Sequence, residues 1–172
     1  MIRPWLAALS LPLMLAGIGA NPGGRGFPRP RHGAARSAPI VRVDVLPSPG
    51  ASGEPLFVKV LIERADRVRG VPFHLLYPPR LLEYESAEAG PFLDAPSGEV
   101  VFMAAGPPGH LFVALSRSGN GRGASGAGLL CTLRFRAKSA GTAVLEFEDA
   151  HVFVDDHEEK GARFVPFRLE IR

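Results

Sequence analysis

Disulfides, flat aromatic platforms and long helices find little support in this sequence of 172 residues. Cys131 is the only cysteine, so the chain forms no internal disulfide. Sugar-binding platforms usually present Trp or Tyr rings, yet the only tryptophan is Trp5 and the only tyrosines are Tyr77 and Tyr84. Glycine (20 residues) and proline (17 residues) are abundant instead, and they separate short apolar runs. This composition is typical of many short strands joined by tight turns.

Acidic residues are absent before Ile40, which makes the net charge of +3 misleading. Five of the 20 basic residues precede this point: Arg3, Arg25, Arg29, Arg31 and Arg36. The remainder therefore holds 15 basic and 17 acidic residues, a net charge of −2. A basic segment ahead of a mildly acidic body is not the pattern of a nucleic-acid-binding surface, so we expect no nucleic-acid partner.

Catalytic motifs are also lacking. The five histidines are scattered and show no H-x-x-x-H or H-E-x-x-H spacing: His32, His74, His110, His151 and His157. Glu146 and Glu148 share one side of a predicted strand, but a two-carboxylate mechanism needs an opposing strand in a cleft. The glycine-rich stretch 118–128 lacks the Gly-Lys-Ser/Thr ending of a phosphate-binding loop. We therefore predict that the protein is not an enzyme and holds no cofactor.

One acidic stretch near the C-terminus allows two interpretations. Its carboxylates are Asp149, Asp155, Asp156, Glu158 and Glu159. Calcium prefers several hard oxygen ligands, but the spacing here does not match a calcium-binding loop. The stretch lies between two apolar runs, so we favour a solvated hairpin turn over a metal site.

The N-terminus has the features of a secretory signal peptide. Residues 1–20 contain Arg3, an apolar core from Trp5 to Ile18 and a small-residue end. An uncleaved anchor is the alternative, but the apolar run is shorter than a membrane span. Residues 21–39 are rich in Gly, Pro and Arg and are predicted to be a disordered linker. We expect a secreted protein, extracellular or periplasmic, that meets a membrane only during export.

From Ile40 onward the sequence alternates between apolar runs and turn residues. The predicted strands are Ile40–Leu46, Leu56–Ile62, Val71–Tyr77, Leu81–Ser86, Glu99–Ala105, His110–Arg117, Gly128–Lys138, Thr142–Glu148, His151–Val154 and Phe164–Ile171. The charged stretch Arg64 to Arg69 is interpreted as a polar loop joining an antiparallel pair. Residues 40–172 are thus predicted to form one all-β domain, a nine-stranded two-sheet sandwich with jelly-roll topology.

Side chains alternate between the two faces of a strand, so the bulkier parity of each run predicts the core. The expected core residues are Phe73, Leu75, Tyr77, Phe102, Phe112, Cys131, Leu133, Phe135, Leu145 and Phe147. Cys131 is accordingly interpreted as a small buried thiol rather than a nucleophile.

Three motifs follow one another along this domain. The pattern G-x-x-F-x-L-x-Y-x-P-x-x-L runs from Gly70 to Leu82, Pro91-Phe92-Leu93 follows the predicted fourth strand, and residues 128–137 read G-x-L-x-x-x-x-F-x-A. In order and spacing these motifs resemble cohesin modules over residues 40–172. The resemblance implies a nine-stranded jelly roll, related to carbohydrate-binding sandwiches, that binds dockerin modules in polysaccharide-degrading assemblies.

We therefore expect a secreted interaction module with a protein partner, either dockerin-like or an envelope protein. A polysaccharide-binding module and a structural part of an envelope or secretion assembly are the alternatives. The expected partner surface is the outward face of the third, fifth and sixth strands, because that parity is mostly apolar. Its predicted residues are His74, Leu76, Val101, Met103, Leu111, Val113, Leu115 and, at the rim, Arg117.

Overall fold

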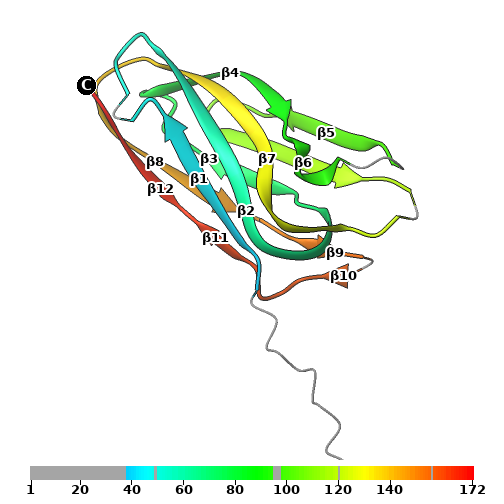
Figure 1. The fold of residues 1–172 in the computed structure, drawn as a ribbon. Coiled ribbons are helices and arrows are strands. Elements are labelled where there is room, and N and C mark those ends of the chain that lie inside the picture. The colour runs from blue at the N-terminus through cyan, green and yellow to red at the C-terminus, as the bar shows by residue number, and fades with distance from the viewer. Residues whose placement is uncertain (1–37, 49, 95–97, 120, 156) are drawn as a thin grey trace, which may run out of the picture. The chain divides into compact units, whose positions relative to one another are not determined.

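The computed structural model describes residues 38–48, 50–94, 98–119, 121–155 and 157–172, which are almost wholly β-structure (Figure 1). The strands are β1 (Ile40–Leu46), β2 (Pro55–Gly70), β3 (Phe73–Leu76), β4 (Leu82–Ala89), β5 (Val100–Ala105), β6 (His110–Arg117), β7 (Ala124–Ala137), β8 (Gly141–Glu148), β9 (Phe153–Val154), β10 (His157–Glu158), β11 (Arg163–Val165) and β12 (Phe167–Ile171). A 3-10 turn, η1, spans Pro91–Leu93. In this part of the chain no helix has the length and apolar character needed to cross a membrane.

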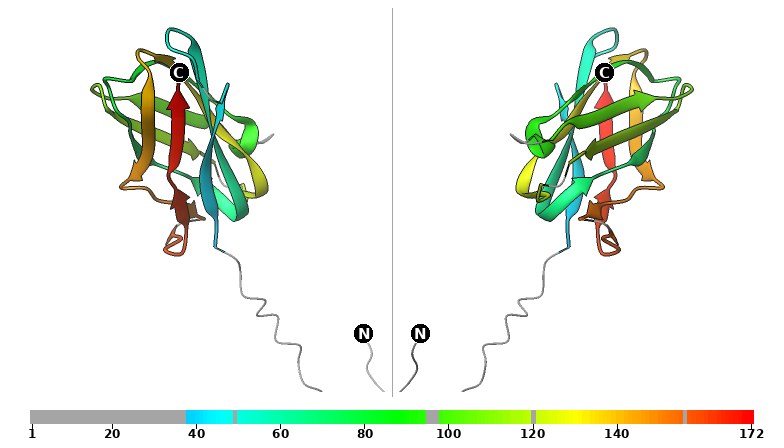
Figure 2. Two further views of the ribbon diagram at one scale, coloured as in Figure 1. Left: turned by 90° about the vertical axis from the view of Figure 1, so that its left-hand side faces the viewer. Right: turned by 90° about the vertical axis from the view of Figure 1, so that its right-hand side faces the viewer.

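The strands form two layers. One layer has the order β4-β7-β2-β1-β11, and the other has the order β5-β6-β3-β8-β12. Two further views show β1 and β2 in one layer and β8 and β12 in the other (Figure 2). This arrangement confirms the predicted all-β sandwich, with twelve strands rather than nine because β9, β10 and the split pair β11 and β12 divide the C-terminal part.

The stretch Arg64 to Arg69 is strand rather than a loop, so this prediction was wrong. It forms the second half of β2, whose pairing with β7 shifts register after Ile62 and again after Ala65. Arg64 and Arg67 adopt positive φ angles of 57° and 56°, which bend the strand at these bulges. The bent end of β2 leaves β1, reaches β6 of the other layer and pairs with β9. β2 and β3 are therefore not an antiparallel pair.

Alternation within the strands builds the core. In β1 and the first half of β2, Val41, Val43, Leu56, Val58 and their period-two neighbours are buried while the intervening residues face outward. At the other end of the chain, β11 pairs in parallel with β1 and β12 pairs antiparallel with β8. The last strands thus contribute to both layers.

Most of the predicted core is confirmed. Phe73, Leu75, Tyr77, Cys131, Leu133, Phe135 and Leu145 are buried, and Phe102 and Phe147 pack against them half-buried. Phe112 was predicted wrongly: it lies across from His74 on the outward side of its layer. The predicted signal peptide, residues 1–20, and residues 21–37 of the predicted linker lie outside the described residues.

Candidate functional site

The outward side of the β5-β6-β3-β8 layer presents rows of directly opposed residues. One row runs from Glu148 through His74 and Phe112 to Ala105, and the next runs from Glu146 through Leu76 to His110. A third row pairs Ala114 with Met103. We call the surface made by these nine residues and Val101 the outer face. Its positions on β5, β6 and β3 are uncharged apart from the two histidines, since they include no Asp, Glu, Lys or Arg, and its two carboxylates lie on β8.

Four of the predicted partner-binding residues lie on the outer face. His74 and Leu76 are half-buried there, and Val101 and Met103 are 54% and 49% exposed. These two are among the most exposed large apolar side chains of the described chain. Their orientation was therefore predicted correctly, while their role in binding stays a prediction.

Leu111, Val113 and Leu115 point the other way, so their predicted exposure was wrong. Each is at most 1% exposed and packs in the core. The bulk of Phe112 suggested that its side of the strand faced inward. The other side is aliphatic at Leu111, Val113 and Leu115 before the strand ends at Arg117, whereas the side of Phe112 also carries His110 and Ser116. An unbroken run of aliphatic residues on one side of a strand indicates the core better than one large ring on the other side. That signal could have identified Phe112 and Ala114 as outward residues.

Arg117 lies at the edge of this surface, at the end of β6. It is half-buried, and its Nη1 donates a hydrogen bond to the carbonyl oxygen of Arg122 at 2.9 Å. Its predicted role at the rim stays a prediction, because Arg117 shares the parity of the buried Leu115 and its guanidinium is held against the chain that precedes β7.

The opposite face of the sandwich is charged. Arg42 donates to Glu63 at 2.7 Å between β1 and β2, and Glu85 of β4 lies between Arg134 and Arg136 of β7. The hydrogen bond from Arg136, together with the nearby Arg134, holds the pKa of Glu85 below its usual value. The two faces thus differ in charge, although the charged face also exposes Leu46 and Phe57.

Two imidazoles and a carboxylate adjoin on the outer face. The rings of His74 and His110 are 4.6 Å apart between centroids, and the His74 ring is 4.9 Å from that of Phe112. His110 Nε2 lies 3.7 Å from an oxygen of Glu148. Within the described ranges, no group of three or more His, Cys, Asp or Glu side chains is arranged to hold a metal ion. The cluster places two ring systems and a carboxylate next to one another on an otherwise apolar surface.

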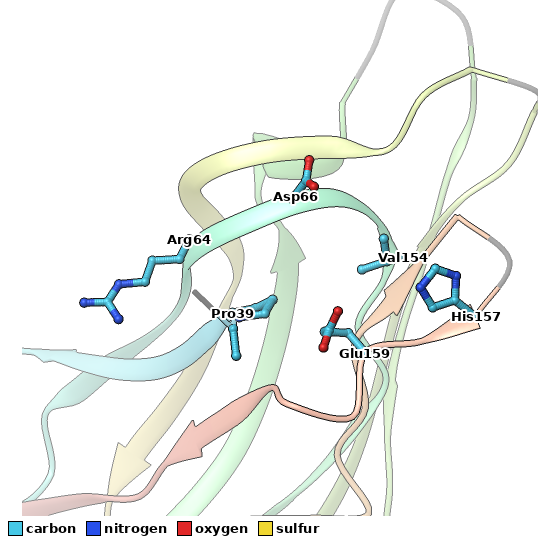
Figure 3. A pocket seen from close by; sticks show the side chains of 7 residues that line it. Pro39, Arg64, Asp66, Val154, His157 and Glu159 are labelled. Carbon is cyan, nitrogen blue, oxygen red and sulfur yellow. The ribbon is translucent and has the colours of Figure 1, made fainter. Parts of the chain in front are cut away.

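A small hollow lies between the bent part of β2 and the β9–β10 hairpin (Figure 3). Its volume is about 110 Å³, below the 300–1,000 Å³ typical of small-molecule sites. Figure 3 shows Arg64 extending away from Glu159 and His157, so the charged groups do not converge on one point. This hollow has neither the size nor the geometry of a substrate site.

The acidic stretch forms contacts at its hairpin and with the neighbouring β2. Asp155 pairs with Arg67 at 2.6 Å, and Glu158 accepts a contact from His151 Nδ1 at 2.8 Å. Asp156 lies outside the described residues. These pairs use the carboxylates for protein contacts and fit the solvated hairpin that the sequence favoured.

The aromatic and thiol groups singled out in the sequence are structural. Tyr77 is 7% exposed, and both Tyr77 and Tyr84 contact the Phe135 ring edge-on at 4.9 and 5.7 Å. Burial, with smaller effects from Cys131 and Tyr77, raises the pKa of Tyr84. Burial also raises the pKa of the Cys131 thiol to about 12, so this thiol is protonated and unreactive at neutral pH. Neither tyrosine offers a flat ring for a sugar.

This protein matches known proteins by its structure and not by its sequence. No protein-family model matches the sequence, and no curated protein matches it significantly. A non-cellulosomal cohesin from the hyperthermophilic archaeon Archaeoglobus fulgidus superposes with a TM-score of 0.65 at 22% identity, covering 78% of this chain and 91% of that one.

Bacterial cohesins give similar matches. A type II cohesin from the adaptor scaffoldin of Acetivibrio cellulolyticus has a TM-score of 0.67 at 13% identity, covering 76% of this chain and 88% of that one. A type I cohesin, solved as a cohesin–dockerin complex from Clostridium thermocellum, has a TM-score of 0.65 at 15% identity, covering 78% and 94%. The domain described here therefore has the cohesin fold.

Proposed function

We propose that this domain is a protein–protein interaction module that binds its partner through the outer face. The observation that carries the proposal is the contrast between the two sides of the sandwich. One side carries charged residues and ion pairs, while the outer face exposes Val101 and Met103 beside the half-buried Phe112, with no Asp, Glu, Lys or Arg on its three strands β5, β6 and β3. Burial of such a surface favours association.

The fold supports a dockerin-like partner. Several solved cohesins of this fold are complexes with dockerins, including those from Clostridium thermocellum and Acetivibrio cellulolyticus. In the proposed complex, Met103 and Phe112 supply apolar contact, while His74 and Glu148 provide hydrogen-bonding groups that fix orientation. An envelope protein with a complementary apolar face is the other partner class.

Capture from the producing organism's secreted proteins tests the proposal. The immobilised protein is compared with Met103→Asp and with the control Leu46→Asp, whose parent residues are 49% and 46% exposed on different faces. The partner retained by the wild type is identified, purified and titrated by calorimetry. We expect Met103→Asp to weaken binding at least about tenfold, or about 1.4 kcal/mol, and Leu46→Asp to leave it unchanged. Equal affinity for all three proteins would place the binding surface elsewhere.

Polysaccharide binding has less support, because Tyr77 and Tyr84 pack into the core rather than forming a platform. Retention of the protein on insoluble polysaccharide, unaffected by Met103→Asp, would favour it over a protein partner. A role in polysaccharide degradation remains attached to the dockerin-like partner and is tested by that partner's identity. Export is proposed from residues 1–20 alone, and N-terminal sequencing of the exported protein checks it.

A further inference from the structure

A groove borders the outer face where β9, the end of β2, β6 and β5 lie next to one another. Gly70 pairs with Phe153 on one side and with Ser116 on the other, and Ser116 in turn pairs with Val101. These four residues therefore form one row across the strands, on the same side of the sheet. The groove has a volume of about 430 Å³, and we call it the Gly70 groove.

Gly70 makes the row concave because it has no side chain. A Cβ placed there would meet Leu115 O and Ser116 Cβ at 3.6 Å and Phe153 Cβ at 3.8 Å, which are ordinary contact distances. The space above Gly70 is therefore open rather than sterically forbidden. Phe153, 39% exposed, forms one wall, and Ala114 and Ser116 form the other. An apolar side chain would fit between them.

Two guanidinium groups are fixed at the rim. Arg69 donates hydrogen bonds to the carbonyl oxygens of Gly119 and Gly121, the latter at 3.0 Å. Arg117 is held by the carbonyl oxygen of Arg122. The two acceptors of Arg69 are uncharged carbonyl oxygens, so they position its guanidinium without neutralising it.

The local charge differs from that of the whole domain. The carboxylate that lines the groove, Asp155, is already paired with Arg67 at 2.6 Å. From Ile40 onward the chain is otherwise acidic, with 17 acidic and 15 basic residues. A positively charged rim beside an apolar groove on such a domain is complementary to an acidic and apolar ligand.

We propose that the Gly70 groove binds an apolar side chain of the partner that stands beside a carboxylate, as in a Phe or Leu next to an Asp or Glu. This inference rests on the proposed interaction function and adds the chemistry of one contact. The apolar side chain lies between Phe153 and Ala114, and the carboxylate accepts hydrogen bonds from Arg69.

N-acetyl-phenylalanine and its uncharged amide test the pocket directly on the full-length protein. Each is titrated while the backbone amide signals are followed by NMR. We expect the acid to shift Gly70, Leu115 and Phe153 and to bind about threefold more tightly than the amide, as for an exposed charge pair. Arg69→Gln should remove that difference, and Gly70→Val should remove binding of both compounds by filling the groove.

Matched exposure provides the control. Phe57 on the charged face is 39% exposed, the same as Phe153. Phe57→Ser should therefore keep the NMR shifts caused by N-acetyl-phenylalanine, whereas Phe153→Ser should lose them. Absence of shifts in the groove, or equal binding of acid and amide, would overturn the proposal. If Gly70→Val does not fold, the comparison of acid and amide binding in Arg69→Gln still tests the proposal.

Partner capture separates this inference from the proposed function. If Met103→Asp abolishes capture while Phe153→Ser and Arg69→Gln bind the partner normally, the groove is excluded and the outer face stands. If the acid binds the groove but no protein is captured, the groove's chemistry is supported and the proposed function fails.

Discussion

At the scale of single residues, the core depends on Phe135. Its ring is fully buried and lies between Tyr77 and Tyr84, both in edge-to-face geometry. Such pairs add to the hydrophobic free energy of burial. Both tyrosines of the chain thus pack against this ring.

Replacing Phe135 by Ala should lower the free energy of unfolding by about 3–5 kcal/mol, because a buried ring is lost and a cavity remains. Denaturant-induced unfolding measures this change. Phe57→Ala serves as the control, since Phe57 is 39% exposed and should cost less than about 1 kcal/mol. Similar losses for both variants would mean that Phe135 is not a core residue.

Cys131 should be silent toward thiol reagents in the folded protein. Its pKa is raised to about 12, so the nucleophilic thiolate is scarce at pH 8, and the side chain is buried. Absorbance assays with an aromatic disulfide should show no reaction at pH 8 and one thiol per chain after guanidinium is added. Rapid reaction without denaturant would contradict this placement.

At the scale of elements, β4 and β7 are joined by Glu85 and its two arginines. Glu85 lies at the point where the β4–β7 register shifts, between Tyr84 and Ser86. Arg134 Nε is 2.8 Å from its carboxylate, and Arg136 Nε donates to it at 2.6 Å. The carboxylate therefore connects two positions of β7 across a bulge.

The Glu85 cluster should make stability depend on pH. Because the pKa of Glu85 is lower in the folded chain than its usual 4.5, its contribution is fully present above that value and is lost as pH falls through the folded pKa. Thermal unfolding from pH 7 to pH 3 should show wild type and Glu85→Gln converging at acid pH. Glu88→Gln, on the same strand, is the control, and a constant difference between wild type and Glu85→Gln would contradict the prediction.

Strand β6 allows a test of which side faces the core. Val113→Asp should cost more than about 4 kcal/mol, because it buries a carboxylate, whereas Ala114→Asp should change stability by less than about 1 kcal/mol. Circular dichroism and denaturant unfolding of both variants measure this. The opposite ranking would restore the orientation first inferred from the sequence.

The bounds of several elements were predictable from local sequence. β1 and β6 begin and end where the alternating pattern predicted, and the Gly/Pro turns separated most other strands correctly. The second half of β2 was missed because Arg64, Asp66 and Arg67 look like a solvated loop. Only the tertiary structure shows that two residues with positive φ bend a continuing strand there.

The candidate site was half predictable. His74 and Met103 were assigned to the correct surface, whereas β6 has large apolar side chains on both sides and its orientation was misread. Phe153 and Gly70 could not be linked to this surface, because their neighbours Ser116 and Val101 are distant in sequence. Which strands pair is decided by long-range packing, and alternation alone does not encode it.

At the scale of the whole molecule, the two layers differ in surface and share a strand. The first half of β2 pairs with β1 and β7, and its end pairs with β6 and β9. Near the C-terminus, β11 joins the layer of β1, and the next strand, β12, joins the layer of β8.

Because the two layers share strand β2, neither layer should unfold while the other stays folded. Opening the first layer pulls on β2 and so withdraws the backbone partner of Ser116 in the second, which should make the domain a single cooperative unit. Native-state hydrogen exchange should therefore give the slowest amides of β2, β7, β3 and β8 one common opening free energy, equal to that of global unfolding. Two separate values, one for each layer, would show that the bent strand behaves as a hinge between independently folding halves.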